Sequence, residues 1–339
     1  MYTFKKIDVN NYKEDQTNRK PPADTQSTVG FKGRAKLADY IFLLRPMILI
    51  PVWTFFLLGS YHAMNSSGID LPPQDIIPGL VSFTLLLGGI YIVNQISDKE
   101  TDLANKKLFL IPKEIISTRA AWIETAILTV ASFAISVLYL NIQFTVILII
   151  SSALGAAYSL RPLRFKGRVA LDVLSNAIGN GVLNTLAGWV VVSTTTGEII
   201  KLAPYPFAVA AVHLATTLAD IEGDRENGIK TTGTALGEKK GIIFSMLLMA
   251  TAVVISAAVN NRIAFFASIV SLPVFLVPSR GGSPELIRSK ALIPVKWATI
   301  IFSIAAGMTF RGYLLWIALV ALLTRLYYKK RFSIKYPSL

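Results

Sequence analysis

The chain has 339 residues, of which 53% are hydrophobic and only 16% charged, whereas soluble globular domains carry about 25% charged residues, so the composition argues against an ordinary water-soluble enzyme. The chain contains no cysteine and only two histidines, which excludes disulfides, thiolate metal sites, cysteine nucleophiles and histidine-rich metal sites. The net charge of +14 would fit a nucleic-acid-binding protein, but the positions of the charges along the chain decide what it means.

Residues 1–36 form a polar and basic segment at the start of the chain. They contain no short apolar core followed by a small-residue cleavage site, so they do not have the pattern of a signal peptide. We expect a solvated cytoplasmic tail, whose basic residues could also touch anionic lipid.

Long apolar runs alternate with short polar loops from residue 37 to residue 330, and a short basic end of residues 331–339 follows. Each run is close to the roughly 20 residues with which a helix crosses a bilayer, and no period-two alternation indicates strands. The runs cover residues 38–63, 76–96, 120–140, 143–160, 170–195, 203–220, 241–259, 262–278, 292–309 and 313–328. The predicted fold is an all-α, polytopic transmembrane bundle of nine or ten helices around a central cavity open near the cytoplasmic face.

The basic residues are distributed unequally between the two ends of the runs. All lysines and arginines except Lys201, Arg262 and Arg311 fall at one set of alternate ends. The positive-inside rule places that set in the cytoplasm, so we expect both termini and the basic loops there. The positive charge therefore reports membrane topology, and nucleic-acid binding is a poor explanation for it.

Two acidic motifs end two of the runs on the basic side. Asn94, Asp98 and Asp102 are four residues apart, and Asp220 and Asp224 repeat that spacing. On a helix this spacing places the side chains along one face. A single cluster would be read as a solvated helix end paired with lysine or arginine. Because carboxylates near hydrocarbon are costly unless they are paired or bind cations, two matching clusters predict a site for Mg²⁺ and phosphate.

A polar stripe follows the fifth run, where Asp172, Asn176, Asn180 and Asn184 are each four residues apart. Such a stripe either bonds neighbouring helices to one another or lines a wet or substrate-filled cavity. We expect Asp172 and Asn176 to line the cavity and Asn184 to bond a neighbouring helix.

Two further side chains lie near the acidic motifs. Tyr158 ends the fourth run, where it either anchors the interface or orients a phosphate or a cation. His213 lies two helical turns before Asp220 and either bonds a neighbour or contacts an acceptor substrate, where it could act as a base.

The two acidic motifs on one side of a polytopic bundle resemble those of the UbiA superfamily of intramembrane prenyltransferases. Three other segments are similar to that family: Leu44-Arg45-Pro46 in the first run, Ala157 to Lys166 after the fourth, and Gly237 after the second motif. The resemblance covers residues 37–330. The paired motifs in this context are specific, whereas either motif alone would be weak.

The resemblance implies an enzyme that uses Mg²⁺ and binds a prenyl diphosphate within the lipid bilayer. Asp98 and Asp102 would hold one Mg²⁺ with Asn94 beside them, and Asp220 and Asp224 would hold the second. The diphosphate would leave as an anion, and a hydrophobic or aromatic acceptor would capture the allylic carbocation. General physical chemistry agrees, because metal ions stabilise charge on a leaving oxygen and an apolar bundle keeps water from the cation.

The chain departs from the family pattern at one phosphate ligand. Family members often follow the first motif with an Asp-Arg-Pro segment, and this chain has residues 108–110, Leu-Phe-Leu, in that place. Lys106, Lys107 or Lys113 would substitute for the missing arginine.

A second departure lies in the basic loop after Tyr158. Many members carry a basic residue four positions after this tyrosine, where this chain has Pro162 between Arg161 and Arg164. The tyrosine is predicted to act in catalysis with the four motif aspartates. The residues predicted to bind substrate are Asn94, Arg45, Lys106, Lys107, Lys113, Arg161, Arg164, Asp172, Asn176 and His213.

Two alternatives remain open at this point. An intramembrane terpene cyclase of the same superfamily would quench the carbocation internally. A cation transporter would place its carboxylates near the middle of the bilayer and break helices at corresponding positions of two halves, whereas these acids lie at one end of the runs. The sequence specifies neither the prenyl chain length nor the acceptor, and it leaves the oligomeric state open.

Overall fold

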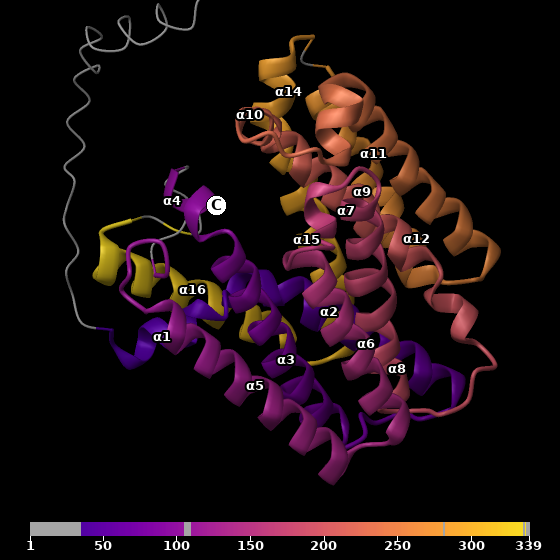
Figure 1. Ribbon diagram of the computed structural model, residues 1–339. Helices are drawn as coiled ribbons and strands as arrows, with labels where there is room; N and C mark the ends of the chain where they lie inside the picture. The colour runs from indigo at the N-terminus through magenta and orange to yellow at the C-terminus, as the bar shows by residue number, and fades with distance from the viewer. Residues whose placement is uncertain (1–34, 105–109, 281, 335, 337–339) are drawn as a thin grey trace, which may run out of the picture. The chain divides into compact units, whose positions relative to one another are not determined.

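A computed structural model describes residues 35–104, 110–280, 282–334 and 336, and every regular element in these ranges is helical (Figure 1). The predicted tail of residues 1–36 lies almost wholly outside them. The α-helices are α1 (Leu37–Leu43), α2 (Pro46–Ser66), α3 (Ile76–Ser97), α4 (Lys99–Ala104), α5 (Thr118–Tyr139), α6 (Ile142–Ser159), α7 (Leu171–Asn176), α8 (Asn184–Val190), α9 (Pro204–Ala219), α10 (Ile221–Glu226), α11 (Thr232–Ala258), α12 (Arg262–Ser271), α13 (Leu276–Ser279), α14 (Pro284–Lys290), α15 (Leu292–Thr309) and α16 (Tyr313–Phe332). Short 3₁₀ turns are η2 (Phe165–Gly167), η4 (Ile199–Leu202) and η5 (Leu272–Phe275), and η3 (Ala177–Leu183) is a π-helical segment.

Eight helical stretches in the described part of the chain are long and apolar enough to cross a bilayer. They are Pro46–Ser66, Ile76–Ser97, Thr118–Tyr139, Ile142–Ser159, Ile199–Ala219, Thr232–Ala258, Arg262–Ser279 and Pro284–Thr309. The fifth predicted run is also helical, as α7, η3 and α8 in succession, and the tenth forms α16, which ends in a basic turn. The predicted all-α transmembrane bundle is confirmed, and the predicted count of nine or ten helices is approximate.

The helices differ in how much of their surface faces protein. In α2 the most apolar 18-residue window is 78% buried, whereas the corresponding window of α5 is 17% buried. A helix that is apolar on all sides is stable when neighbours or lipid surround it. The first apolar run therefore forms a central helix, and α5, which packs along α3, leaves most of its apolar surface for lipid (Figure 1).

Close contact between α2 and α8 depends on two glycines. A Cβ atom at Gly188 would lie 1.8 Å from the backbone oxygen of Phe56, and one at Gly59 would lie 1.9 Å from that of Thr185. Small residues let backbones approach where lipid supplies no hydrophobic drive for helix association. This contact fixes α8, and with it the polar stripe of the fifth run, against the central helix.

The C-terminal helix α16 packs against α1, the first described helix, through polar and aromatic contacts. Arg331 donates to both carboxylate oxygens of the buried Asp39 at 3.1 and 3.2 Å, and the Tyr327 hydroxyl donates to the same carboxylate at 2.7 Å. The ring of Phe42 stacks on that of Tyr327 at 3.9 Å. These contacts hold α1 in place immediately before Arg45, where the chain turns into α2.

Candidate active site

The first acidic motif lies where one helix gives way to another. Asp98 stands between α3 and α4 with φ −103° and ψ 5°, so the predicted single helix through the motif is interrupted there. The amide of Asp98 still donates to the carbonyl of Asn94 at 3.1 Å, and that of Asp102 donates to the carbonyl of Asp98 at 2.8 Å. The three residues therefore keep one helical turn between them despite the break.

The second motif has the same backbone design. Asp220 stands between α9 and α10 with φ −101° and ψ 1°, and the amide of Asp224 donates to its carbonyl at 2.9 Å. Both junction aspartates lie in the sparsely populated bridge region, where active-site residues are often found. In each motif one aspartate thus stands at a junction, and the next aspartate lies on a helix of six residues.

The loop between α6 and α7 folds back over the first motif. The Lys166 ammonium donates to Asp98 Oδ1 at 2.7 Å and to Ser97 Oγ at 2.6 Å, and Arg164 lies 3.6 Å from the same carboxylate oxygen. Burial lowers the pKa of Lys166 below its ordinary value, and the Asp98 carboxylate opposes that effect only in part. Arg164 was predicted, but Lys166 was not singled out, because one loop lysine among several carries no distinguishing pattern.

Tyr158 lies at the C-terminal end of α6, next to the basic loop. Its hydroxyl interacts with the side chain of Asn176 on α7, and the charges of Asp98, Asp172 and Asp224 lie within electrostatic range of it. These three acids come from three different parts of the chain. The end of α6 is therefore within electrostatic range of one aspartate from each acidic motif.

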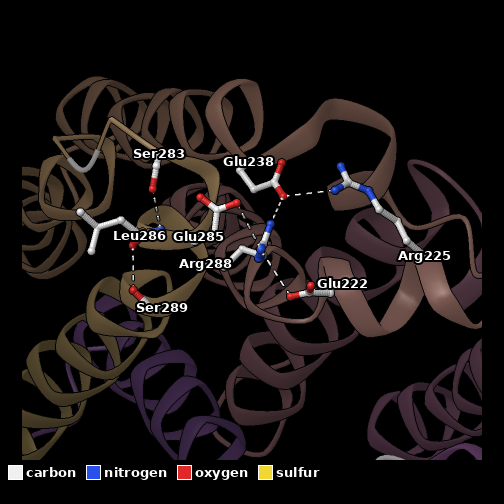
Figure 2. Close-up of polar contacts among 8 residues, drawn as sticks. All are labelled: Glu222, Arg225, Glu238, Ser283, Glu285, Leu286, Arg288 and Ser289. Atoms are coloured by element: carbon white, nitrogen blue, oxygen red, sulfur yellow. Dashed lines mark hydrogen bonds and ion pairs between the residues drawn. The ribbon is translucent and has the colours of Figure 1, made fainter. Parts of the chain in front are cut away.

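An ion-pair network centred on the buried carboxylate of Glu238 joins α10 to α11 and α14 (Figure 2). The carboxylate of Glu238, with 8% of its side chain exposed, accepts from Arg288 at 2.7 Å and from Arg225 at 3.3 Å. Arg288 also lies 3.3 Å from Glu222. Gly237, with φ +72°, interrupts α11 one residue earlier, a conformation that favours glycine. Because Glu222 and Arg225 both lie on α10, the network holds this helix in place.

A cavity of about 350 Å³ extends between α2, α3, α6, α7, η3, α8 and α9. Asn94 and Tyr158 border it beside the first motif. Arg45 also lines it, held at the junction of α1 and α2 with φ +58°. Non-glycine residues in this conformation are uncommon and cluster at functional sites. Polar side chains are numerous in the wall, but apolar atoms form most of the surface of the cavity.

Polar side chains of the fifth run form a hydrogen-bonded ladder down one wall of the cavity. The amide of Asn184 donates to Asn180 at 3.3 Å, and that of Asn180 donates to Asn176 at 3.1 Å. At the upper end, Asn176 Nδ2 donates to the backbone carbonyl of Asp172 at 3.1 Å and lies 3.3 Å from His213 Nε2. All three asparagines and the histidine line the cavity.

Other predicted residues lie elsewhere in the described part of the chain. Asp172 is absent from the cavity wall, and its buried carboxylate accepts from the amide and the hydroxyl of Thr232 at the start of α11. Arg161 is exposed and borders a second, basic hollow together with Arg164. Lys113 is exposed. Lys106 and Lys107 lie outside the described residues. The predicted contacts of all these residues with substrate stay predictions.

The donor atoms suit a hard cation. Among the described residues, no group of three acidic or histidine side chains gathers closely enough to hold a metal ion by itself. The motifs instead offer carboxylate oxygens in pairs, and Asp98 already attracts two cationic side chains. Mg²⁺ uses one or two carboxylates, keeps waters and completes its shell with substrate phosphate, so the residues fit such a metal.

Two curated proteins are similar to this chain over part of its length. A lycopene elongase/hydratase of Haloferax volcanii is 31% identical over 158 residues, which cover 47% of this chain and 51% of that protein. The bacteriochlorophyll synthase 34 kDa chain of Chloroflexus aurantiacus is 28% identical over 207 residues, covering 60% of this chain and 66% of that protein. The chain thus spans between half and two thirds of the length of these two relatives.

A solved structure shares the fold. A UbiA homologue from Archaeoglobus fulgidus, bound to GPP and Mg²⁺, superimposes with a TM-score of 0.59 at 21% identity and covers 78% of this chain and 99% of that one. The sequence profile of the UbiA prenyltransferase family matches residues 47–281, which include both acidic motifs, the basic loop and the whole polar ladder. The chain therefore belongs to the UbiA prenyltransferase family.

Proposed function

We propose that the protein is a Mg²⁺-dependent enzyme that transfers a polyprenyl group from a prenyl diphosphate to a hydrophobic or aromatic acceptor. One observation carries the proposal: the first acidic motif, whose Asp98 attracts Lys166 and Arg164, borders through Asn94 a cavity whose surface is mostly formed by apolar atoms. The site therefore combines groups that can bind an anion with an adjacent cavity that can accommodate an isoprenoid chain. The positive-inside pattern puts this end of the bundle in the cytoplasm.

Each of the two acidic motifs would hold one of the two metal ions. Asp98 and Asp102, with Asn94, would hold one Mg²⁺, and Asp220 and Asp224 would hold the other. The bound metals would stabilise the negative charge that develops on the departing diphosphate. The six-residue helices α4 and α10 present the carboxylates, and the ion-pair network around Glu238 keeps α10 in place.

The remaining residues handle the diphosphate and the carbon chain. Lys166 and Arg164 would turn from Asp98 to the diphosphate oxygens, because both already reach toward this carboxylate. The bond between the first prenyl carbon and its oxygen breaks, and the electron pair leaves with the diphosphate. A nucleophilic atom of the acceptor then bonds to the allylic cation, and the proton that it loses passes to the released diphosphate. The apolar cavity wall keeps water from the cation, and Tyr158 presents its ring and hydroxyl at the point of ionisation.

The names of the relatives support both the donor and the class of acceptor. The Archaeoglobus homologue was solved with GPP and Mg²⁺, a prenyl diphosphate and the proposed metal. The Haloferax and Chloroflexus relatives are named for lycopene and bacteriochlorophyll, which are large and hydrophobic. We therefore propose an acceptor of this kind for the present chain.

Diphosphate release from geranylgeranyl diphosphate tests the proposal. We expect membranes containing the full-length protein to release diphosphate with Mg²⁺ and not with EDTA. Asp98→Asn and Asp220→Asn should each reduce the rate at least about 100-fold, as expected when a group that stabilises developing charge is lost. Mass spectrometry after addition of a lipid extract identifies the prenylated acceptor.

Two neighbouring acids provide matched controls. Glu100 and Glu226 lie on α4 and α10, are exposed and fall outside the four-residue spacing of the motifs. Glu100→Gln and Glu226→Gln should retain activity. Full activity in the double variant Asp98→Asn/Asp220→Asn would rule the proposed function out.

A further inference from the structure

The hydrogen-bonded ladder of the fifth run has a fixed direction. Asn176 Nδ2 donates to the backbone carbonyl of Asp172, which can only accept. The side-chain oxygen of Asn176 therefore accepts from Asn180, and the oxygen of Asn180 accepts from Asn184. Because every amide donates toward the upper end, the lower end of the ladder must present an acceptor, the Oδ1 atom of Asn184.

This oxygen has no hydrogen-bond partner among the described residues, although the Asn184 side chain is 0% exposed. A second unpartnered atom in the described part of the chain lies in the same cavity wall, Oγ of Ser151 on α6, at 6% exposure. The adjacent Ser152 instead donates to the carbonyl of Leu148 one turn earlier. A buried polar atom without a partner costs free energy, so two such atoms on residues that line one cavity point to a missing ligand.

The two atoms lie at a similar depth in the cavity. Tyr158 of α6 interacts with Asn176 of α7, and from this contact the two stretches run in opposite chain directions into the bundle. Ser151 is seven residues from Tyr158, and Asn184 is eight residues from Asn176. At the helical rise both are about 10 Å below the tyrosine. Segments η3 and α8 pack directly against α6, which brings the two walls together.

We propose that the deep end of the cavity is a binding subsite for one O–H group, which donates its hydrogen to Asn184 Oδ1 and accepts one from Ser151 Oγ. The subsite deepens the proposed function and rests on it, because that function makes this cavity the substrate chamber. The O–H group is either a hydroxyl of a lipid-like substrate, remote from its reacting end, or a bound water. A purely hydrocarbon chain leaves both polar atoms unpaired, so the subsite selects against it.

Binding of farnesol and of farnesene, which has the same carbon skeleton without the hydroxyl, tests the subsite. The shift in thermal unfolding of the full-length protein reports the affinity of each probe. We expect the wild type to bind farnesol at least about tenfold more tightly, the factor that one satisfied buried hydrogen bond is worth. Asn184→Leu and Ser151→Ala should abolish this preference, and Ser152→Ala should retain it.

The outcomes separate the two sources of the O–H group. An alcohol preference that depends on both residues identifies a substrate hydroxyl. If the wild type shows no preference, an experimental map with an ordered water within 3.5 Å of both atoms identifies water. An alcohol preference that survives both substitutions overturns the proposal. So does the absence of both a preference and an ordered water.

Diphosphate release is measured in parallel on the same proteins. Failure of the wild type to release diphosphate from any prenyl diphosphate would contradict the proposed function, whatever the binding results. Release that continues normally while the alcohol preference and the ordered water are both missing would contradict the subsite alone.

Discussion

Asp98 attracts two cationic side chains and is also a proposed ligand of Mg²⁺. It occupies the junction of α3 and α4, where it accepts a hydrogen bond from Lys166 and attracts Arg164. A carboxylate beside an apolar span is costly unless it is paired, so these cations stabilise the site. Under the proposed function the same cations would bind the diphosphate, and the loop between α6 and α7 would take part in substrate recognition.

Replacement of Lys166 by Met tests that role. We expect the KM for geranylgeranyl diphosphate to rise about 10- to 100-fold, because a charge-assisted hydrogen bond to the diphosphate is lost. Steady-state kinetics of diphosphate release measure the change. Lys230→Met removes an exposed lysine from the loop between α10 and α11 and should leave KM unchanged. Equal kinetics in the two variants would remove Lys166 from substrate binding.

At the scale of elements, the short helix α10 is too small to hold its own orientation. A six-residue helix has few internal hydrogen bonds, and isolated helices this short are unstable in water. The buried carboxylate of Glu238 supplies the missing support, since it connects α10 through Arg225 with α14 through Arg288 (Figure 2). The orientation of α10, which carries Asp224, is thus fixed by contacts with α11 and α14.

Glu238→Gln should therefore impair metal binding without removing a metal ligand. We expect the Mg²⁺ concentration for half-maximal diphosphate release to rise about 10-fold or more, a loss comparable with that of other groups that orient metal ligands. Glu285→Gln is the matched control, because Glu285 is 73% exposed and lies 3.8 Å from the same Arg288. If Glu238→Gln lowers thermal stability but leaves the Mg²⁺ dependence unchanged, the network serves stability alone.

At the scale of the whole molecule, the chain is an integral, multi-pass membrane protein whose site is enclosed by helices distant in sequence. The cavity has walls from α2 through α9, and the α2–α8 contact holds two of them together. This contact leaves no room for a side chain at Gly188. The integrity of the chamber therefore depends on residues that touch no substrate.

Gly188→Ala should destabilise the bundle by about 1–3 kcal/mol, the usual cost of overpacking a close contact. The thermal unfolding midpoint in detergent should fall accordingly. Gly197→Ala is the control, since a Cβ atom at Gly197 would meet nothing within 4 Å. An unchanged midpoint for Gly188→Ala would show that α2 and α8 can separate at no cost.

The helical class of the fold and the order of its apolar helices could be read from the sequence, because the apolar runs and the basic loops report directly on the bilayer, whereas the predicted count of nine or ten helices is approximate. The breaks at Asp98 and Asp220 could not, since the four-residue spacing predicts one continuous helix in each motif. Lys166 and Glu238 were likewise not singled out. Both act through residues far away in the chain, and a sequence of this composition offers many equivalent lysines and glutamates.

Asn184 shows most clearly what the sequence determines and what the tertiary structure determines. The sequence by itself determined a helical membrane bundle with acidic motifs and a polar stripe, because hydropathy, charge and helical period are local properties of the chain. Asn184 was expected to bond a neighbouring helix, yet the residue lines the cavity and its side-chain oxygen has no partner among the described residues. Only the tertiary structure decided this, because the direction of a hydrogen-bonded ladder and the wall it faces depend on which helices pack together.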